Sequence, residues 1–339
     1  MEKNNVVLDV SDLRVYFHTK KGTAKAVDGN NFQLRANETL AIVGESGCGK
    51  SVTAMSILGL VDEPGEIEEG SKIMYGNVNL ATAKLSELEE IRGNDISMIF
   101  QEPMTSLNPV FRVGDQIMEN ILLHQDVTKE EAKEKAIEMI KLVGISRPEK
   151  VFSDYPHQLS GGMRQRIMIA MALACAPKVL IADEPTTALD VTIQAQILTL
   201  MNDLKKKTGT AIMLITHDLG VVAQMADRVN VMYAGKVVES AEVNELFKNP
   251  KHPYTIGLMG SMPNLNTDSD RLNTIEGYVP NSLYLPKGCY FADRCNKVMP
   301  KCLESQPPVV EIKEGHKCAC FLYEEKPHHT KEVKTDGKA

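Results

Sequence analysis

Two glycine-rich motifs, more than a hundred residues apart, contain the residue types that hold phosphate. Residues 44–51 read GESGCGKS and match the phosphate-loop pattern G-x-x-x-x-G-K-[ST] at every fixed position. In such a loop, glycines let backbone N–H groups converge on phosphate oxygens, and the following helix adds its positive N-terminal end. We expect Lys50 to neutralise the β and γ phosphates and Ser51 to hold Mg²⁺. Residues 159–166, LSGGMRQR, contain a Ser-Gly-Gly run that can also bring N–H groups and a hydroxyl against an anion.

Two adjacent carboxylates follow an apolar run, residues 179–184 (VLIADE). Asp183 stands where a Mg²⁺-binding acid is needed, and Glu184 can polarise an attacking water. A positioned base of this kind contributes roughly 10²–10⁴ in rate. Two solvated acids that merely end a strand are the alternative, and the intact phosphate loop disfavours it.

Gln101 and His217 each follow a predicted strand. The amide of Gln101 could reach Mg²⁺ or the attacking water, or it could belong to an ordinary polar loop. His217 ends a buried strand, at the edge of a parallel sheet where ligands bind, and could donate to a γ-phosphate. A lone histidine is more often structural, so the role of His217 depends on its context.

The elements that must position these residues alternate between strand and helix. Apolar patterns predict strands at 6–17, 32–34, 39–43, 96–100, 179–182 and 211–215, and helices at 51–60, 119–123, 129–143 and 192–206. The phosphate loop thus lies between a strand and a helix, as its chemistry requires. This alternation predicts an α/β fold with a mostly parallel sheet.

Composition limits the class of protein. The chain has 339 residues, 43% of them hydrophobic, which suffices for two domains or for one domain with an appendage. A formal net charge of −7 disfavours a nucleic-acid partner. The longest apolar run, about 167–176, is shorter than the ~20 residues of a membrane span, and the N-terminus shows no secretory signal. We therefore expect a soluble, cytoplasmic chain whose membrane role, if any, comes through a partner.

These segments together resemble the nucleotide-binding subunit of an ABC transporter, over roughly residues 6–250. The resemblance implies a P-loop NTPase (RecA-like) core with an antiparallel β subdomain and an inserted α-helical subdomain at about 102–176. It also implies ATP and Mg²⁺ as ligands and hydrolysis of ATP by Glu184, His217 and Gln101. The implied nucleotide contacts are Tyr16, Gly44, Ser46, Gly47, Cys48, Gly49, Lys50, Ser51, Val52, Gln101, Asp183, Glu184 and His217, with Mg²⁺ held by Ser51, Gln101 and Asp183.

In this family the signature motif of one subunit closes over the ATP of another. By resemblance, Ser160, Gly161, Gly162 and Asp190 are expected to act on the ATP of a partner subunit. Met163 stands where glutamine is usual in that motif. The aromatic residue that stacks on adenine would be Tyr16 or Phe17, and we select Tyr16 because Phe17 shares an apolar face with Leu13 and Val15.

Three further segments narrow the resemblance to oligopeptide and dipeptide permease ATPases: residues 98–109, 249–255 and 288–295. We expect a domain at 1–250, a cysteine-rich extension at 251–323 and a disordered tail at 324–339. The implied partners are a second ATPase subunit, a homologue in a heterodimer, two membrane permease subunits at the cytoplasmic face, and an extracytoplasmic peptide-binding protein. A nickel importer of the same subfamily, a soluble ABC ATPase of DNA repair or translation, and a non-hydrolysing binder are the alternatives.

Five of the seven cysteines lie in the last part of the chain, and in a reducing cytoplasm such clustering indicates metal ligation before disulfides. The spacing of Cys289, Cys295, Cys302 and Cys318 fits neither a zinc ribbon nor a standard ferredoxin pattern. Some peptide-permease ATPases look similar here and carry a [4Fe-4S] cluster. The resemblance implies such a cluster on these four residues, with Cys320 as an alternative to Cys318. Zn²⁺ or free thiols remain possible.

Overall fold

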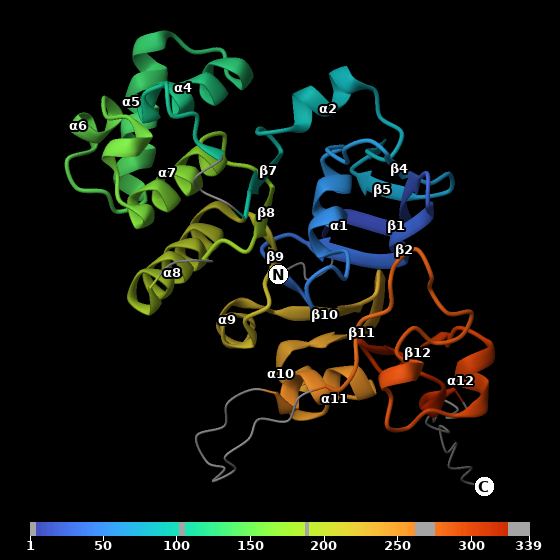
Figure 1. The fold of residues 1–339 in the computed structure, drawn as a ribbon. Helices are drawn as coiled ribbons and strands as arrows, with labels where there is room; N and C mark the ends of the chain where they lie inside the picture. Colours follow the sequence, from blue (N-terminus) through green and yellow to red (C-terminus); the bar gives the residue numbers. More distant parts are fainter. Residues whose placement is uncertain (1–4, 102–105, 187–189, 262–274, 325–339) are drawn as a thin grey trace, which may run out of the picture.

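The computed structural model describes residues 5–101, 106–186, 190–261 and 275–324, and within them the strands form two sheets (Figure 1). The smaller sheet is antiparallel, with β2-β1-β5-β6 in order and β4 beside β1. Its strands are β1 (Val6–Thr19), β2 (Gly22–Arg35), β4 (Gly65–Ile67), β5 (Lys72–Tyr75) and β6 (Val78–Asn79). This sheet is the antiparallel subdomain that the resemblance implied.

The larger sheet has the order β12-β13-β11-β10-β3-β9-β8-β7, and its β10-to-β7 part is parallel. Its strands are β3 (Thr39–Val43), β7 (Ile96–Ile99), β8 (Val179–Asp183), β9 (Ala211–Ile215), β10 (Arg228–Tyr233), β11 (Lys236–Glu242), β12 (Val309–Lys313) and β13 (His316–Ala319). The α/β class and the mostly parallel sheet are confirmed. The strands at 39–43, 179–182 and 211–215 are found within a residue of their predicted ends.

Both faces of the central strands are buried. Alternate residues of β8 enter different clusters: Leu180 and Ala182 pack with α4, α7 and α8, whereas Val179 and Ile181 pack with α1 and the antiparallel sheet. Successive side chains on a strand point to opposite faces, so a continuous apolar run is what such a strand requires. The central sheet therefore separates two parts of the core, and the predicted site residues lie at the ends of its strands.

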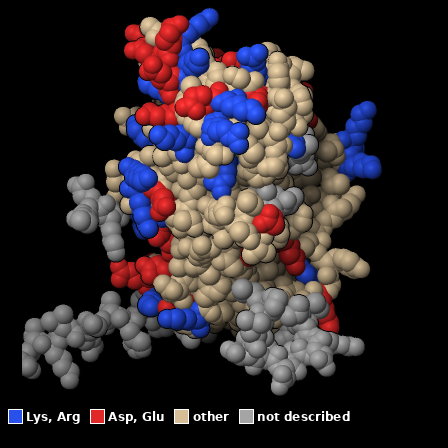
Figure 2. Space-filling model, turned by 90° about the vertical axis from the view of Figure 1, so that its left-hand side faces the viewer, with Lys and Arg blue, Asp and Glu red and all other residues tan. Residues whose placement is uncertain are grey.

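Helices α4 to α7 form the inserted helical part, drawn in green in Figure 1. Helix α5 illustrates why it folds. Thr128 and Glu131 cap its start reciprocally, and Ala132, Ala136 and Ile140 recur at four-residue spacing and are buried. On this side of the molecule, Figure 2 shows acidic and basic side chains mixed rather than one basic patch. The helix bounds are α1 (Lys50–Ile57), α2 (Leu85–Ile91), α4 (Val113–His124), α5 (Lys129–Leu142), α6 (Pro148–Phe152), α7 (Gly161–Leu173), α8 (Val191–Thr208), α9 (Leu219–Met225), α10 (Val243–Lys248), α11 (Pro253–Gly260) and α12 (Pro300–Glu304).

The cysteine-rich extension shares both sheet and core with the rest of the chain. Strand β13 pairs with β11 through Glu239↔Cys318, so the extension continues the central sheet. Tyr254 and Phe291 of the extension pack in one cluster with Val43 of β3 and Tyr233 of β10. The domain boundaries of the sequence analysis remain predictions, and residues 325–339 lie outside the described residues.

Candidate functional site

The predicted chemical residues meet at one edge of the central sheet because their strands are parallel and in register. Asp183 at the end of β8 lies opposite Ile215 at the end of β9, which in turn pairs with Ile42 of β3. The residues that follow these strand ends are therefore neighbours, although they are up to 173 positions apart in the chain. This is the edge at which open α/β sheets bind ligands.

The phosphate loop joins β3 to α1, and two of its glycines are required by close backbone approach. Gly44 has φ 156°, and a Cβ there would lie 2.2 Å from the carbonyl oxygen of Met232. Gly49 has φ 98°, and a Cβ there would lie 2.2 Å from the carbonyl oxygen of Ala26. Any larger residue would push the loop away from β10 or β2. Ser46 and Gly47 between them are exposed, as the part that faces a ligand must be.

Lys50 is buried at the start of α1 and points back across its own loop. Its Nζ donates to the carbonyl oxygens of Gly44 at 2.9 Å and Glu45 at 3.1 Å. The positive charge of this ammonium, next to the backbone N–H groups of the loop, can neutralise the negative charge of a phosphate. The two carbonyls hold it in the position from which it can exchange to phosphate oxygens.

Asp183 and Ser51 fit a divalent cation. Asp183 is 3% exposed, and its Oδ1 has no hydrogen-bond partner among the described residues. Burial and the nearby charge of Glu184 raise the pKa of Asp183, although a hydrogen bond with Ser51 and the charge of Lys50 lower it. A buried carboxylate oxygen without a partner is costly unless a cation or proton satisfies it. Oxygen ligands of this kind suit Mg²⁺, so the donor set agrees with the expectation.

Glu184 is held between Gln101 and His217. Gln101 donates from Nε2 to Oε2 of Glu184 at 3.2 Å, and Nδ1 of His217 lies 3.2 Å from Oε1. Glu184 itself has φ 47°, and its N–H donates to the carbonyl of Ile215. A non-glycine residue in this left-handed conformation is strained, and such strain is common at reaction centres. The structure thus brings together all three residues predicted to be catalytic.

The second glycine-rich motif is elsewhere in the fold. Ser160 caps α7 by accepting the N–H of Met163 at 3.3 Å, and Ser160 and Gly161 are exposed. Asp190 likewise caps α8 by accepting the N–H of Ile193 at 2.9 Å and is exposed. Figure 1 shows β7 and β8 between α7 and α1. The structure therefore does not bring these residues to the chain's own phosphate loop, and their action on a partner's ATP remains a prediction.

Tyr16 has polar partners of its own. Its hydroxyl donates to Asp28 at 2.6 Å, and Nζ of Lys25 lies 5.1 Å from its ring centroid. Phe17 instead packs in the cluster that contains Ile57 of α1, and its ring touches the position of Gly65. The stacking of Tyr16 on adenine remains a prediction, with Phe17 as the alternative.

The iron–sulfur cluster remains a prediction that the structure does not support. Cys289, Cys295, Cys302 and Cys320 line one small cavity with Phe291, Met299 and Phe321. Burial raises the pKa of the Cys289 thiol to about 11 and also raises the pKa of Cys295 and Cys320. Metal binding requires thiolates, so these thiols are held in the unfavourable form. Among the described residues, no group of three or more His, Cys, Asp or Glu has the geometry of a metal site.

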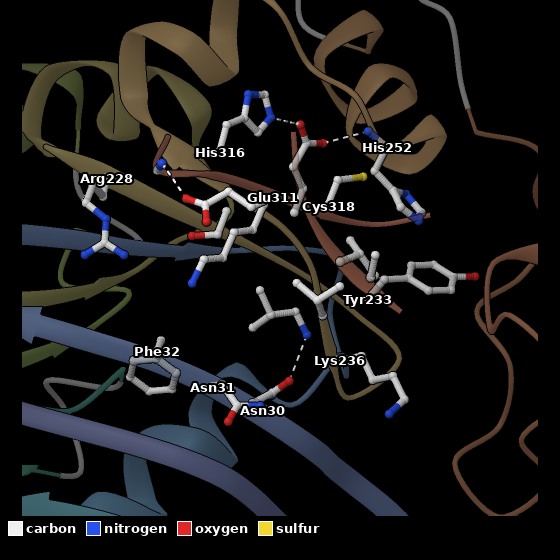
Figure 3. A pocket seen from close by; sticks show the side chains of 18 of the residues that line it. Asn30, Asn31, Phe32, Arg228, Tyr233, Lys236, His252, Glu311, His316 and Cys318 are labelled. Carbon is white, nitrogen blue, oxygen red and sulfur yellow. Dashed lines mark hydrogen bonds and ion pairs between the residues drawn. The ribbon is translucent and has the colours of Figure 1, made fainter. Parts of the chain in front are cut away.

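Cys320, the alternative to Cys318 as the fourth ligand, lines this cavity, whereas Cys318 is not among the residues that line it. Cys318 lies on β13 and lines a different cleft, of about 1200 Å³, between β2 and the extension (Figure 3). In that cleft Glu239 accepts hydrogen bonds from the backbone N–H of His252 at 2.8 Å and lies 2.8 Å from Nε2 of His316. Cys318 is the third residue of β13, Cys320 directly follows the last residue of that strand, and the two cysteines line different cavities.

Sequence reasoning missed the residues that hold the phosphate loop from outside. Tyr254 accepts the N–H of Glu45 at 3.0 Å, and Arg294 pairs with the Glu45 carboxylate at 2.7 Å. Both belong to the extension. No local motif indicates these contacts, since the partners are 209 and 249 residues apart.

Comparisons with known proteins identify the family to which this chain is similar. Residues 27–187 match the family model described as ABC transporter, and residues 238–302 match the one described as oligopeptide/dipeptide transporter, C-terminal region. The oligopeptide transport ATP-binding protein AppD of Bacillus subtilis is 54% identical, over 95% of this chain and 98% of its own length. OppD of Salmonella typhimurium is 51% identical over 94% of each chain, and the dipeptide transport protein DppD of Bacillus subtilis is 50% identical over 97% of each.

Solved structures show the same architecture. The dimeric structure of the bacterial ABC transporter cassette MJ0796 is 26% identical with a TM-score of 0.63, covering 70% of this chain and 98% of its own. The same cassette has been solved in a post-hydrolysis state bound to ADP and Pi, with a TM-score of 0.63 and 25% identity over the same shares. Within the described residues, no helix combines the length and the apolar composition that a membrane span needs.

Proposed function

Because the chain belongs to the family of ATP-binding subunits of oligopeptide and dipeptide ABC transporters, we propose that it hydrolyses ATP to drive the uptake of peptides. The observation that supports hydrolysis most directly is Glu184 held by both Gln101 and His217, next to Asp183 and the phosphate loop. The extension, whose family model takes its description from peptide transporters, supports the peptide class.

The geometry supports a division of work among these residues. Lys50 and the N–H groups of the loop bind the triphosphate. Ser51 would hold Mg²⁺ together with the Asp183 oxygen that no described residue satisfies. The cation would neutralise charge on the phosphates. Glu184 orients and polarises the water, and His217 and Gln101 fix the direction of its carboxylate. A carboxylate already held by two partners needs little reorganisation when the reaction begins.

The exposed Ser160 and Gly161 support the proposal that a second ATPase subunit completes the site. The N-terminus of α7, at the positive end of the helix dipole, suits the phosphates of an ATP bound to a neighbour. We propose a homologous subunit as that neighbour, two permease subunits in the membrane, and an extracytoplasmic peptide-binding protein. In this arrangement the chain attaches to the cytoplasmic face through its membrane partners.

Substrate-dependent stimulation of ATP hydrolysis tests the peptide assignment. The complete transporter in lipid vesicles is supplied with its binding protein, loaded either with a mixture of short peptides or with Ni²⁺. We expect peptides to raise ATP turnover severalfold above the basal rate and Ni²⁺ to leave it unchanged. Stimulation by Ni²⁺ with no response to peptides would assign the chain to nickel import instead.

We also propose that the cavity lined by Cys289, Cys295, Cys302 and Cys320 holds a thiolate-bound metal, with [4Fe-4S] as the first candidate. The four cysteines that line this one cavity support the proposal. Iron content and visible absorbance of anaerobically purified protein test the proposal without reference to activity. We expect Cys320→Ser to lose the metal and Cys318→Ser to keep it. Colourless protein without iron or zinc would remove the proposal and leave the ATPase assignment untouched.

A further inference from the structure

Residues of the C-terminal extension bind one side of the phosphate loop. Nη1 and Nη2 of Arg294 donate to Oε2 and Oε1 of Glu45 at 2.7 and 3.0 Å, a bidentate pair. The Arg294 side chain is 5% exposed and that of Glu45 28%, so water screens the pair weakly. Tyr254, 0% exposed, accepts the N–H of the same glutamate at 3.0 Å. The extension therefore holds both the side chain and the backbone of Glu45, the second residue of the loop.

Arg294 is itself fixed at every donor. Its Nε donates to the carbonyl of Glu276 at 3.0 Å, and its remaining Nη hydrogens donate to the carbonyl of Ile275 at 3.1 Å and the hydroxyl of Tyr233 at 3.4 Å. A guanidinium has five N–H donors, and all five are used. The Glu45 carboxylate raises the pKa of Arg294, so the charge is permanent. Such a group holds a position and has no freedom to serve as a ligand.

The held residue also positions the phosphate-binding lysine. The backbone carbonyl of Glu45 accepts Nζ of Lys50 at 3.1 Å, beside that of Gly44 at 2.9 Å. On the opposite side of the loop, Ser46 and Gly47 are exposed, and a Cβ on Gly47 would meet no atom within 4 Å. The loop is thus anchored where it faces the extension and open where a triphosphate would enter.

We propose that Arg294 is a positioning residue for ATP binding, through which the extension keeps the phosphate loop in its binding conformation before the nucleotide arrives. Preorganisation removes an ordering cost that binding would otherwise bear. Gln101, Glu184 and His217 follow the ends of β7, β8 and β9, and the five donors of Arg294 all go to other residues. Loss of the anchor should therefore raise KM for ATP and leave kcat nearly unchanged, which a general loss of folding would not do.

A double-mutant cycle in the complete transporter tests this proposal, which rests on the proposed ATP hydrolysis. We expect Arg294→Lys and Glu45→Gln each to raise KM for ATP about tenfold with kcat within about twofold, and the double variant to be no worse than either single one. Equilibrium binding of a fluorescent ATP analogue to the same variants measures the loop separately. If wild-type protein bound the analogue without hydrolysing ATP, the proposed function would fail while the binding comparison stayed valid.

The Arg228–Glu38 pair provides the matched control. Nη1 of Arg228 lies 3.1 Å from Oε1 of Glu38, both side chains are largely buried, and Glu38 stands at the opposite end of β3 from the loop. Arg228→Lys and Glu38→Gln should lower thermal stability and leave KM for ATP unchanged. An unchanged KM and analogue affinity in Glu45→Gln, or an equal rise in KM from the control pair, would overturn the proposal.

Discussion

The nucleotide-binding edge and the C-terminal extension organise polar groups in opposite ways. At the edge, each chemical residue follows the end of a parallel strand, so the register of β3, β8 and β9 brings the residues together. In the extension, the important contacts join residues without regular spacing, such as Asp28 with Tyr290 and Glu45 with Arg294. Where strands are regular and parallel, short motifs are enough to predict which residues meet. Where the packing is irregular, the contacts are known only from the folded structure.

The largest expected effect lies at the edge. Glu184→Gln keeps the size of the side chain, but it removes the charge that polarises water and replaces one accepting oxygen with an NH₂ donor. We expect ATP hydrolysis to fall about 10²–10⁴-fold with ATP affinity preserved, and the ATP-bound dimer to accumulate. Single-turnover hydrolysis and gel filtration with ATP and Mg²⁺ measure both. Normal hydrolysis by this variant would show that the base is another residue.

Substitution of Ser160, in the second glycine-rich motif, tests whether the nucleotide-binding edge needs a partner subunit to hydrolyse ATP. Ser160→Ala should lower ATP turnover about tenfold, because the hydroxyl that we propose to bind a partner's phosphate is lost. Thr128→Ala is the matched control, since Thr128 caps α5 by accepting the N–H of Glu131 at 3.2 Å and faces no nucleotide. Both variants lose a helix cap worth about 1 kcal/mol. Equal turnover in the two variants would leave Ser160 with a capping role alone.

Prediction from sequence succeeded where a chemical motif stands at the end of a continuous apolar run. Strands 39–43 and 211–215 were predicted at their observed ends, because a fully buried strand is a continuous apolar run. Asp183, Glu184 and His217 were predicted because each stands within two residues of the end of such a run. Strands β10 and β11 were not predicted individually, and neither was the continuation of the sheet through β13. The positions of these strands depend on pairing between segments that are far apart in the sequence, and the local hydrophobic pattern does not specify such pairing.

The choice between Cys318 and Cys320 shows the same limit. Both cysteines stand at plausible spacings from Cys302, and only the end of β13 decides which one reaches the cavity. Tyr16 is a related case, since strand alternation separates it from Phe17 but does not reveal its hydrogen bond to Asp28.

The smallest effect concerns stability at the junction of the two regions. Asp28 accepts the hydroxyls of Tyr16 and Tyr290 at 2.6 and 2.7 Å and pairs with Lys236 at 3.0 Å. Burial alone would raise the pKa of Asp28, but these hydrogen bonds lower it to about 2. A lowered folded-state pKa contributes stability that is present above the unfolded pKa near 4 and is lost as pH falls toward 2.

Asp28→Asn should therefore cost about 2 kcal/mol at pH 7, a figure set by the pKa shift. The difference from wild type should shrink as pH falls from 4 toward 2. Urea denaturation at pH 7, 4 and 3 measures it. A difference that stayed constant over this range would show that packing, and not the carboxylate charge, joins the extension to β2.

ATP-driven peptide accumulation is the most direct test of the central claim, that this edge powers peptide uptake. The complete transporter, in vesicles with its loaded binding protein, receives a labelled oligopeptide and ATP on the side that carries this subunit. We predict accumulation with wild-type protein and with Glu134→Gln, an exposed control on α5, and loss of accumulation with Glu184→Gln. Equal accumulation with Glu184→Gln, or hydrolysis by the wild type without accumulation, would contradict the account.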